Sequence, residues 1–250
     1  MAGALFLGTQ GWAYKSWVGA FYPPGTKSGD FLAEYAKHFR AVEIDSTYYA
    51  LPRPHSVEQW RDATPAHFRF AAKFPQIITH EKMLKDAERE TEQFLATLGL
   101  LGEKLGPLLL QFPYTFTPEQ HDALARYLAA LPPQFRYAVE VRQRGWLNDA
   151  FFDLLEQQRV ALALSDYGSM PRSARATTDF AYVRLLGNRK DITDEQFDRV
   201  RLNRDADLDR WSDLIVALNE KGVMTWCFVN NHYQGHSPAT VRALGERIAR

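Results

Sequence analysis

Residues 107–142, PLLLQFPYTFTPEQHDALARYLAALPPQFRYAVEVR, contain two strand patterns separated by one helix pattern. The runs PLLLQF (107–112) and RYAVEVR (136–142) are short, apolar and bounded by polar or proline residues, as buried strands are. Between them, TPEQ (117–120) places a capping threonine before a proline, with glutamine three residues after the cap. This combination is typical of a helix start, and apolar residues then recur at helical spacing. A strand, a helix and a strand in this order predict a parallel pair of strands.

The same alternation extends over the whole chain. Six further strand-like runs are LFLGT (5–9), AVEIDST (41–47), HFRFAAK (67–73), VALALSD (160–166), FAYVRLLG (180–187) and MTWCFVNN (224–231), and helical patterns begin at Ser28 and Ser237 and cover residues 81–104 and 207–221. Eight such units favour one (β/α)8 TIM-type barrel over residues 1–250 as a single domain. An open doubly wound sheet is the alternative, but no G-x-G-x-x-G follows the first run. Residues 167–179 lack a helical period, so we expect an irregular unit between strands six and seven.

Composition excludes several classes of protein. Lys+Arg is 30 and Asp+Glu is 30, so the formal net charge is zero and no global basic field attracts nucleic acid or an anionic membrane. Cys227 is the one cysteine, and its apolar surroundings predict a buried, inert thiol in a reducing compartment. No apolar stretch approaches the ~20 residues that span a bilayer, and no signal-peptide pattern is present. We therefore expect a cytoplasmic protein; the oligomeric state is left open.

Side-chain alternation predicts a charged inner wall. In residues 41–47, Val42 and Ile44 should face the helices, which turns the intervening polar residues inward. The same argument applies to the third, fifth and seventh strands. The predicted inner set contains the acids Glu43, Asp45, Glu140 and Asp166 and the bases Arg69, Lys73, Arg142 and Arg184, although the alternation does not decide which way Asp166, Gln111 and Asn230 point. In TIM barrels the carboxyl ends of the strands carry the active site.

Charges buried at such a wall must pair, stay hydrated or bind a ligand, because an unpaired buried charge costs several kcal/mol. From strand spacing, we expect the carboxylates of Glu43 and Glu140 to lie roughly 6–9 Å apart, which is wide enough for a ligand or water between them. Neighbouring strands should bring Glu43 near Lys73, and Glu140 near Asp166. An internal salt-bridge network that only fixes strand register is the structural alternative.

Several motifs resemble the YecE-like family, which is also called domain of unknown function 72. They are GTQGWAYKSWVGAFYP, EIDSTYYALP, ITH (78–80), LLLQFP, EVRQRGW, YVRLLG and FVNNHYQGHSP, in this order from about Gly8 to the last helix. The resemblance implies a (β/α) barrel and brings no assigned reaction. Positions that match its motifs are Trp12, Tyr14, Trp17, Glu43, Thr47, Lys73, Thr79, His80, Gln111, Glu140, Arg142, Trp146, Asp166, Arg184, Gly187, Asn230 and Asn231. Departures are Gln10, Asp45, Gln143 and Leu186, where relatives have serine, asparagine and two histidines.

The first functional hypothesis is acid–base catalysis on a small polar or anionic ligand, such as a sugar, a sugar phosphate or a nucleotide-like molecule. Its catalytic candidates are Glu43, Lys73, His80, Glu140 and Asp166, with Glu140 or Glu43 as base and His80 or Lys73 as acid. Its binding candidates are Trp12, Tyr14, Trp17, Thr47, Gln111, Arg142, Trp146, Arg184, Asn230 and Asn231. Arginines would hold a phosphate or carboxylate, and the three tryptophans would wall the pocket.

The second hypothesis is a hydrolase or isomerase that depends on Mg²⁺ or Mn²⁺ bound by Glu43, Glu140 and Asp166. Because four cations are predicted at the same mouth and no H-x-H or H-E-x-x-H motif occurs, we expect no required cofactor. The third is a non-enzymatic module for nucleotides or nucleic acid, supported by the basic loop residues Arg172, Arg175, Arg189, Lys190, Arg199, Arg201 and Arg204. Acidic residues interleave the last three of these in DITDEQFDRVRLNRDADLDRW (191–211), which indicates a solvated surface instead.

Two familiar barrel chemistries fit this pattern poorly. An imine at Lys73 needs a depressed lysine pKa, whereas an adjacent Glu43 would favour the charged ammonium. Retaining glycoside hydrolysis needs carboxyl groups about 5–5.5 Å apart, closer than we expect for Glu43 and Glu140.

Overall fold

Eight parallel strands close into a barrel in the computed structural model, which describes residues 3–166, 168, 170–171 and 175–250. Each strand pairs with the next along the chain, and the eighth pairs with the first. The strands are β1 (Leu5–Gln10), β2 (Ala41–Ile44), β3 (Arg69–Lys73), β4 (Leu105–Gln111), β5 (Tyr137–Glu140), β6 (Ala161–Asp166), β7 (Phe180–Leu185) and β8 (Met224–Val229). The predicted TIM-type barrel is therefore confirmed.

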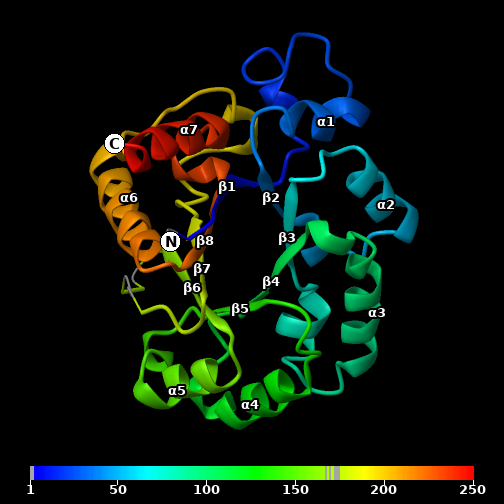
Figure 1. The fold of residues 1–250 in the computed structure, drawn as a ribbon, viewed down its shortest axis with the longest axis vertical. Coiled ribbons are helices and arrows are strands. Elements are labelled where there is room, and N and C mark those ends of the chain that lie inside the picture. The colour runs from blue at the N-terminus through cyan, green and yellow to red at the C-terminus, as the bar shows by residue number, and fades with distance from the viewer. Residues whose placement is uncertain (1–2, 167, 169, 172–174) are drawn as a thin grey trace.

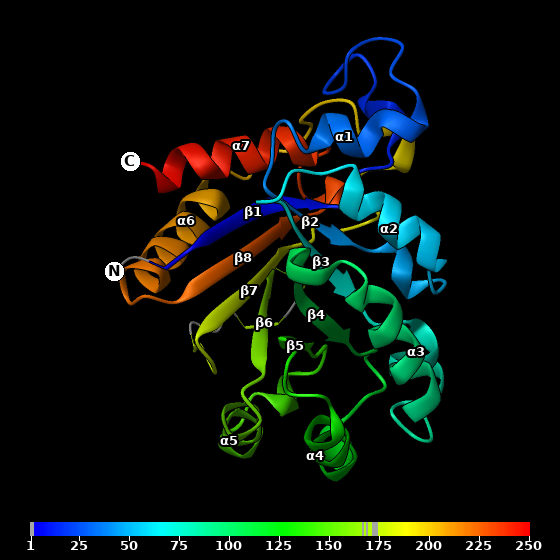
Figure 2. The ribbon, with the colours of Figure 1, turned by 45° about the vertical axis from the view of Figure 1, so that its right-hand side comes forward.

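Seven helices among the described residues surround the barrel (Figure 1). They are α1 (Phe31–Tyr35), α2 (Pro54–Asp62), α3 (Glu88–Gly99), α4 (His121–Ala130), α5 (Asp149–Gln157), α6 (Asp205–Glu220) and α7 (Ser237–Ile248). Between β6 and β7, the described residues 168, 170–171 and 175–179 contain no helix, as the missing helical period predicted. The rest of that predicted irregular unit lies outside the described residues. Figure 2 shows α7 lying along β1.

The inside of the barrel is filled by large aromatic residues on one side and small residues on the other. Phe180, Tyr182, Trp226 and Phe228 project from β7 and β8, and alanines face them from β2, β3, β5 and β6. On β4 the contact is closer still, because a Cβ on Gly106 would lie 2.7 Å from the Trp226 ring. This packing leaves no channel through the lower barrel, so the polar groups at the strand ends rest on an apolar floor.

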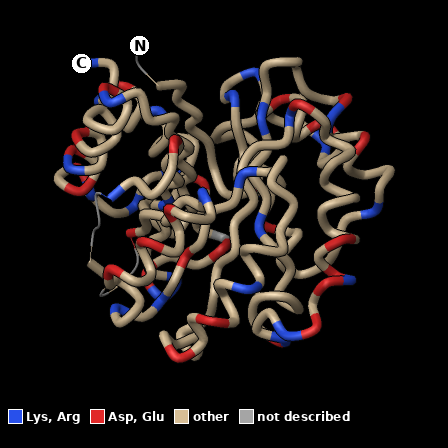
Figure 3. Tube along the Cα trace, turned by 60° about the horizontal axis from the view of Figure 1, so that its bottom comes forward, with Lys and Arg blue, Asp and Glu red and all other residues tan. Residues whose placement is uncertain are grey.

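The outer faces of the strands carry the second apolar layer. Val42 and Ile44 are fully buried against the helices, as the alternation predicted, and Cys227 is also fully buried in this layer. Figure 3 shows acidic and basic residues dispersed along the outer helices, which agrees with the balanced net charge. No helix within the described part of the chain combines the length and the apolarity that a bilayer crossing requires.

Candidate functional site

A cavity of about 750 Å³ opens at the carboxyl ends of the strands. Its wall comes from the ends of the strands and from the loops that follow them, as in other barrels of this type. The lining residues are Gln10, Asp45, Tyr48, Tyr49, Lys73, Gln111, Pro113, Tyr114, Arg142, Gly168, Arg184, Leu186, Gly187, Asn188, Arg189, Lys190, Asn230 and His232. The predicted inner residues Lys73, Gln111, Arg142, Arg184 and Asn230 are thus brought together at one mouth.

Arg184 is the centre of the charge network beneath this mouth. Its Nη2 and Nε donate to the two carboxylate oxygens of Glu43 at 2.7 and 3.0 Å, and its Nη1 donates to Glu140 Oε2 at 2.6 Å. The other oxygen of Glu140 lies 2.5 Å from Arg142 Nη2, and both carboxylates are fully buried. The guanidinium therefore fills the space between the two glutamates. The space that was expected to suit a ligand or water is thus occupied by one arginine that bridges both carboxylates.

The pairing keeps Glu140 ionised. Burial alone would raise the pKa of Glu140, but Arg142 and Arg184 outweigh it and hold this pKa below the usual range. The Tyr182 hydroxyl donates to Glu43 Oε2 at 2.7 Å from below, and its pKa is raised by burial and by Glu43. Glu140 therefore has little tendency to accept a proton near neutral pH. Its electrostatic role is to balance the arginines.

Lys73 is excluded from this network. Its Nζ lies 3.7 Å from the centroid of the Tyr48 ring, and no hydrogen bond or ion pair joins it to any described residue. Burial and the nearby guanidinium of Arg184 lower the pKa of Lys73 to about 7. The predicted contact between Glu43 and Lys73 is absent because Glu43 is held by Arg184 and Tyr182. Glu43 does favour the charged form of Lys73, as expected, but burial and Arg184 outweigh it.

Asp45 is an acidic group that lines the cavity and lies outside the network. It follows β2, lines the cavity, and its carboxylate makes no hydrogen bond or ion pair with another described residue. Burial and the neighbouring Glu43 raise its pKa. Lys73 and Asp45 are thus shifted toward each other in pKa, from opposite directions, at the ends of neighbouring strands. Such pairs are typical of acid–base sites.

A buried amide pair forms another part of the wall. The Asn230 amide donates to Gln10 Oε1 at 2.9 Å, while Gln10 Nε2 has no partner within the described part of the chain. Gln10 is only 2% exposed, so this donor is desolvated without compensation in the empty cavity. A ligand oxygen would satisfy it. The amide of Gln111 is already used, since it donates to the Phe112 carbonyl at 2.5 Å.

His80 lies beside the site on a π-helical turn, Ile77–Glu81, a local geometry that is frequent at functional sites. Its Nδ1 is 2.8 Å from Thr79 Oγ1, and its ring contacts the Tyr48 ring edge to face. Burial, Lys73 and Arg142 lower the pKa of His80 to about 4. The imidazole is therefore neutral at pH 7, and this disfavours the predicted role of His80 as an acid.

Comparison with known proteins identifies the family. The family model described as protein of unknown function DUF72 matches residues 6–250. This chain belongs to the DUF72 family. The UPF0759 protein YecE of Escherichia coli strain K12 is 39% identical over 138 residues, which cover 55% of this chain and 48%, about half, of that protein. The UPF0759 protein YunF of Bacillus subtilis is 30% identical over 203 residues, covering 74% of this chain and 71% of YunF.

Solved structures carry the same fold. The crystal structure of a DUF72 family protein of Thermotoga maritima superposes with a TM-score of 0.83 at 27% identity, covering 99% of this chain and 100% of that one. A DUF72 family protein of Enterococcus faecalis has a TM-score of 0.77 at 20% identity, with coverage of 99% and 98%. The second likeness extends to the fold alone. The resemblance inferred from the sequence motifs is confirmed by these matches.

Several residues predicted for the site instead support the scaffold of this DUF72 member. The Trp17 indole donates to Asn231 Oδ1 at 3.3 Å, and the Trp146 indole donates to the Phe116 carbonyl at 2.9 Å. Trp12 packs edge to face against Trp60 at 5.5 Å. None of these three tryptophans is among the lining residues, so the predicted tryptophan wall was wrong. Indole N–H groups need buried acceptors, and the loops provide them away from the mouth.

Three polar residues of the motifs act in the same way. Thr47 Oγ1 donates to the Lys73 carbonyl at 2.7 Å and ties the end of β2 to β3. The Tyr14 hydroxyl donates to the Gln10 carbonyl at 2.8 Å, and Asn231 Oδ1 accepts from Ser237 Oγ at 2.8 Å where α7 begins. Their contacts position the residues that line the cavity, and none of the three lines it.

Two of the predicted inner charges lie elsewhere. Asp166 accepts from the Trp211 indole of α6 at 3.2 Å and therefore lies on the outer side of β6, away from Glu140. Arg69 begins β3 opposite Ala41 and donates to the Ala66 carbonyl at 2.8 Å, at the amino end of the barrel. The three carboxylates proposed for Mg²⁺ or Mn²⁺ are consequently not brought together: two face Arg184, and the third faces α6.

The sequence did not indicate the loop tyrosines of the site. Tyr48, Tyr49 and Tyr114 line the cavity, and Arg189 and Lys190, which the third hypothesis named, extend it with positive charge. The signal was the position of these residues a few places after strand ends. Gly187 (φ +68°) allows this loop to approach the turn that follows β8, because a Cβ there would lie 2.1 Å from the His232 carbonyl oxygen.

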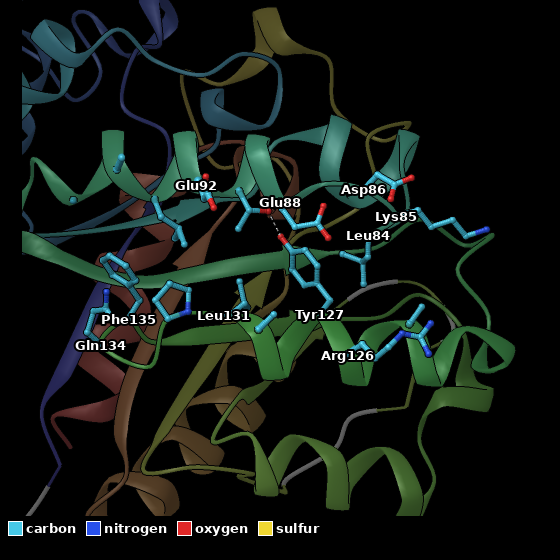
Figure 4. A pocket seen from close by; sticks show the side chains of 17 residues that line it. Leu84, Lys85, Asp86, Glu88, Glu92, Arg126, Tyr127, Leu131, Gln134 and Phe135 are labelled. Atoms are coloured by element: carbon cyan, nitrogen blue, oxygen red, sulfur yellow. Dashed lines mark hydrogen bonds between the residues drawn. The ribbon is translucent and has the colours of Figure 1, made fainter.

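A second hollow of about 950 Å³ lies on the outside of the barrel between α3 and α4 (Figure 4). Leu84, Tyr127, Leu131 and Phe135 face it, and the Tyr127 hydroxyl is 2.5 Å from Thr91 Oγ1 across the two helices. Acidic and basic residues are confined to its rim and do not converge as they do at the barrel mouth. The mouth is therefore the candidate site of this DUF72 member.

Proposed function

We propose that this DUF72 member is an enzyme that moves protons on a small anionic molecule bound at the barrel mouth. The single observation that carries the proposal is that Lys73 and Asp45, outside the paired network, face one cavity with pKa values shifted toward neutrality. A group works best as acid or base when its pKa lies near the operating pH. Lys73 is the proton carrier of this mechanism, and Asp45 is its partner.

The remaining charges hold the ligand in the proposed mechanism. Arg142, Arg189 and Lys190 line the mouth beside Lys73 and attract a phosphate or carboxylate. The orphaned Nε2 of Gln10 donates to a hydroxyl or carbonyl oxygen. Tyr48, Tyr49 and Tyr114 offer ring faces to a sugar or base. A sugar phosphate or a nucleotide-like molecule combines these features.

A purely structural network is the competing interpretation, and it accounts for Glu43, Glu140 and Arg184. It does not account for Lys73, because a lysine that is buried without an anionic partner weakens the fold. Nor does it account for the unsatisfied Gln10 amide. Residues that cost stability at a pocket are typical of functional sites.

The nucleic-acid hypothesis has less support. Arg201 pairs with Asp198 at 2.6 Å, and Arg204 lies 3.6 Å from Asp207. These acids neutralise the basic segment that motivated the hypothesis.

The test is exchange of carbon-bound hydrogen with D2O. A panel of sugar phosphates and keto acids is incubated with the full chain and followed by NMR. We expect deuterium incorporation into at least one compound, and a loss of roughly 100-fold or more in the exchange rate for both Lys73→Met and Asp45→Asn. Lys15→Met, on an exposed turn away from the cavity, is the matched control. Exchange that persists unchanged in both site variants would refute the proposal.

A further inference from the structure

We infer that Lys73 is a nucleophile that forms an imine with the carbonyl carbon of an anionic aldehyde or ketone. The inference rests on the proposed function and deepens it, because it names the substrate class: small carbonyl compounds that carry a phosphate or carboxylate. This inference differs from the expectation from sequence, where Glu43 was expected to favour the charged ammonium of Lys73 and so to disfavour an imine.

The contacts of Lys73 leave its amine available. The Nζ atom lies 3.7 Å from the centroid of the Tyr48 ring, and Lys73 lines the cavity. The two carboxylates that are buried nearby are occupied, Glu43 by Arg184 and Tyr182, and Glu140 by Arg184 and Arg142. No described carboxylate therefore holds the lysine as an ammonium by direct contact. The positive guanidinium groups nearby oppose its protonation, as burial does.

The same surroundings suit the product of the reaction. An iminium ion carries its positive charge where the ammonium would, so it keeps the attraction of Glu43 and Glu140 that Lys73 already feels. The flat C=N group extends from the Tyr48 face into the cavity. A phosphate or carboxylate on the substrate reaches Arg189 or Lys190 at the rim.

The chemical step balances without an oxidant or a reductant. The lone pair of the neutral Lys73 amine forms the C–N bond, and the carbonyl π electrons move to oxygen. This oxygen takes one proton from Asp45 in its acid form, which the raised pKa of Asp45 favours. The nitrogen loses one proton, which returns to the Asp45 carboxylate. The hydroxyl of this carbinolamine then leaves as water with that proton, and the C=N bond forms with one hydrogen left on nitrogen.

Reductive trapping tests the inference directly. The full chain is treated with glyceraldehyde 3-phosphate and cyanoborohydride, which delivers hydride to the iminium carbon, and the modified lysines are mapped by mass spectrometry. We expect Lys73 to be labelled at least roughly ten-fold faster than Lys190, because its pKa is lowered to about 7 and a large share of its amine is therefore neutral at pH 7. Lys190 is an exposed lysine at the same rim and serves as the internal control. Uncharged glyceraldehyde should show a weaker preference for Lys73.

Two further measurements separate the outcomes. The labelling rate at Lys73 should rise with pH to a plateau with a midpoint near pH 7, and Lys73→Arg, which keeps the charge, should lose the label at this position while remaining folded by circular dichroism. Labelling spread evenly over exposed lysines would overturn the inference. Deuterium exchange without any trapped imine would leave the proton-transfer function intact and remove the imine alone. A trapped imine at Lys73 without deuterium exchange would support the nucleophilic role of Lys73 and refute the proton-transfer function.

Discussion

Arg184 contacts two carboxylates that come from strands far apart in the chain, and the residues around it divide into two groups. Glu43, Glu140 and Arg184 satisfy one another by short, fully buried contacts. Lys73 and Asp45 keep their charged ends toward the cavity. The first group is a rigid electrostatic platform, and the second group is chemically available. Separate variants of the two groups should therefore behave in opposite ways.

Replacing Arg184 by methionine should destabilise the protein by about 3–5 kcal/mol at pH 7, because two carboxylates lose their buried partner. In the native chain the lowered pKa of Glu140 contributes stability above about pH 4.3 that is lost as the pH falls through the folded pKa. Without Arg184, the carboxylates protonate more readily. The difference in unfolding free energy between Arg184→Met and the native chain should thus become smaller at acidic pH, as measured by urea unfolding at several pH values. Arg126→Met on the exposed face of α4 should change neither the unfolding free energy nor its pH dependence.

Replacing Lys73 by methionine should have the opposite effect. Because the folded state holds Lys73 at a pKa of about 7, the unfolded chain binds this proton more tightly between pH 7 and about 10.4. Native stability therefore rises with pH over this window, and the full cost of the charge is present below pH 7. We expect Lys73→Met to raise the free energy of unfolding by on the order of 3 kcal/mol at pH 6 and by progressively less toward pH 10. Lys190→Met should leave the unfolding free energy unchanged at both pH values.

Whether these side chains point into or out of the barrel could be predicted only where polar and apolar residues alternate along the strand. Val42 and Ile44 flank Glu43, so its inward direction was readable from the sequence. The run VALALSD is apolar on both sides of the strand, which left the direction of Asp166 undecided. Pairing was not predictable, because the partner of Arg184 depends on how β2, β5 and β7 approach across the barrel. The availability of Lys73 followed from that pairing.

Among the secondary structure elements, the region after β3 departs most from its sequence pattern. The helical period predicted a helix over residues 81–104, whereas α3 covers Glu88–Gly99. A π-helical turn comes first, and Met83, Leu84 and Asp86 then have φ angles between +46° and +71°. These are unfavourable conformations for residues other than glycine, and the segment contains no glycine that could have indicated them. Packing of the buried Leu84 and Ala87 overrides the local preference.

The start of α4 shows the opposite case, where local sequence decides. The capping box of Thr117 and Gln120 forms as predicted, and the Thr117 amide donates to Gln120 Oε1 at 2.8 Å. Thr117→Ala should lower the free energy of unfolding by about 1 kcal/mol, because an orphaned amide of the first turn loses its acceptor. Urea unfolding is the measurement, and Thr115→Ala in the same exposed loop is the control. Equal effects of both substitutions would contradict a capping role.

For the whole molecule, the closed ring follows from the regular alternation of strands and helices, and this regularity made the fold predictable. Every strand has two partners, so no sheet edge is exposed among the described residues. The loops were less predictable, since they pack by contacts between segments far apart in sequence. This explains why the position of the mouth was predicted but its tyrosines were not.

The reactivity of the Cys227 thiol can be used to detect unfolding of the barrel. It is fully buried on β8, and burial raises the pKa of its thiol. A thiol reagent such as dithionitrobenzoate should therefore react with the native protein only at the rate of unfolding, and fully in denaturant. Labelling kinetics followed alongside the circular dichroism signal of unfolding test this expectation. Rapid labelling of the folded protein would indicate that β8 opens locally.

The bridge made by Arg184 has a consequence for how such a barrel could be divided. A cut between β4 and β5 would leave Glu43, Asp45 and Lys73 on one polypeptide, and Glu140, Arg142 and Arg184 on the other. Glu43 on the first fragment and Arg184 on the second would then be separated from each other, so each fragment would lack an ion-pair partner that the other fragment carries. We expect co-expressed half-barrels to complement each other and to regain the cavity only as a heterodimer, with the guanidinium as the joint between them.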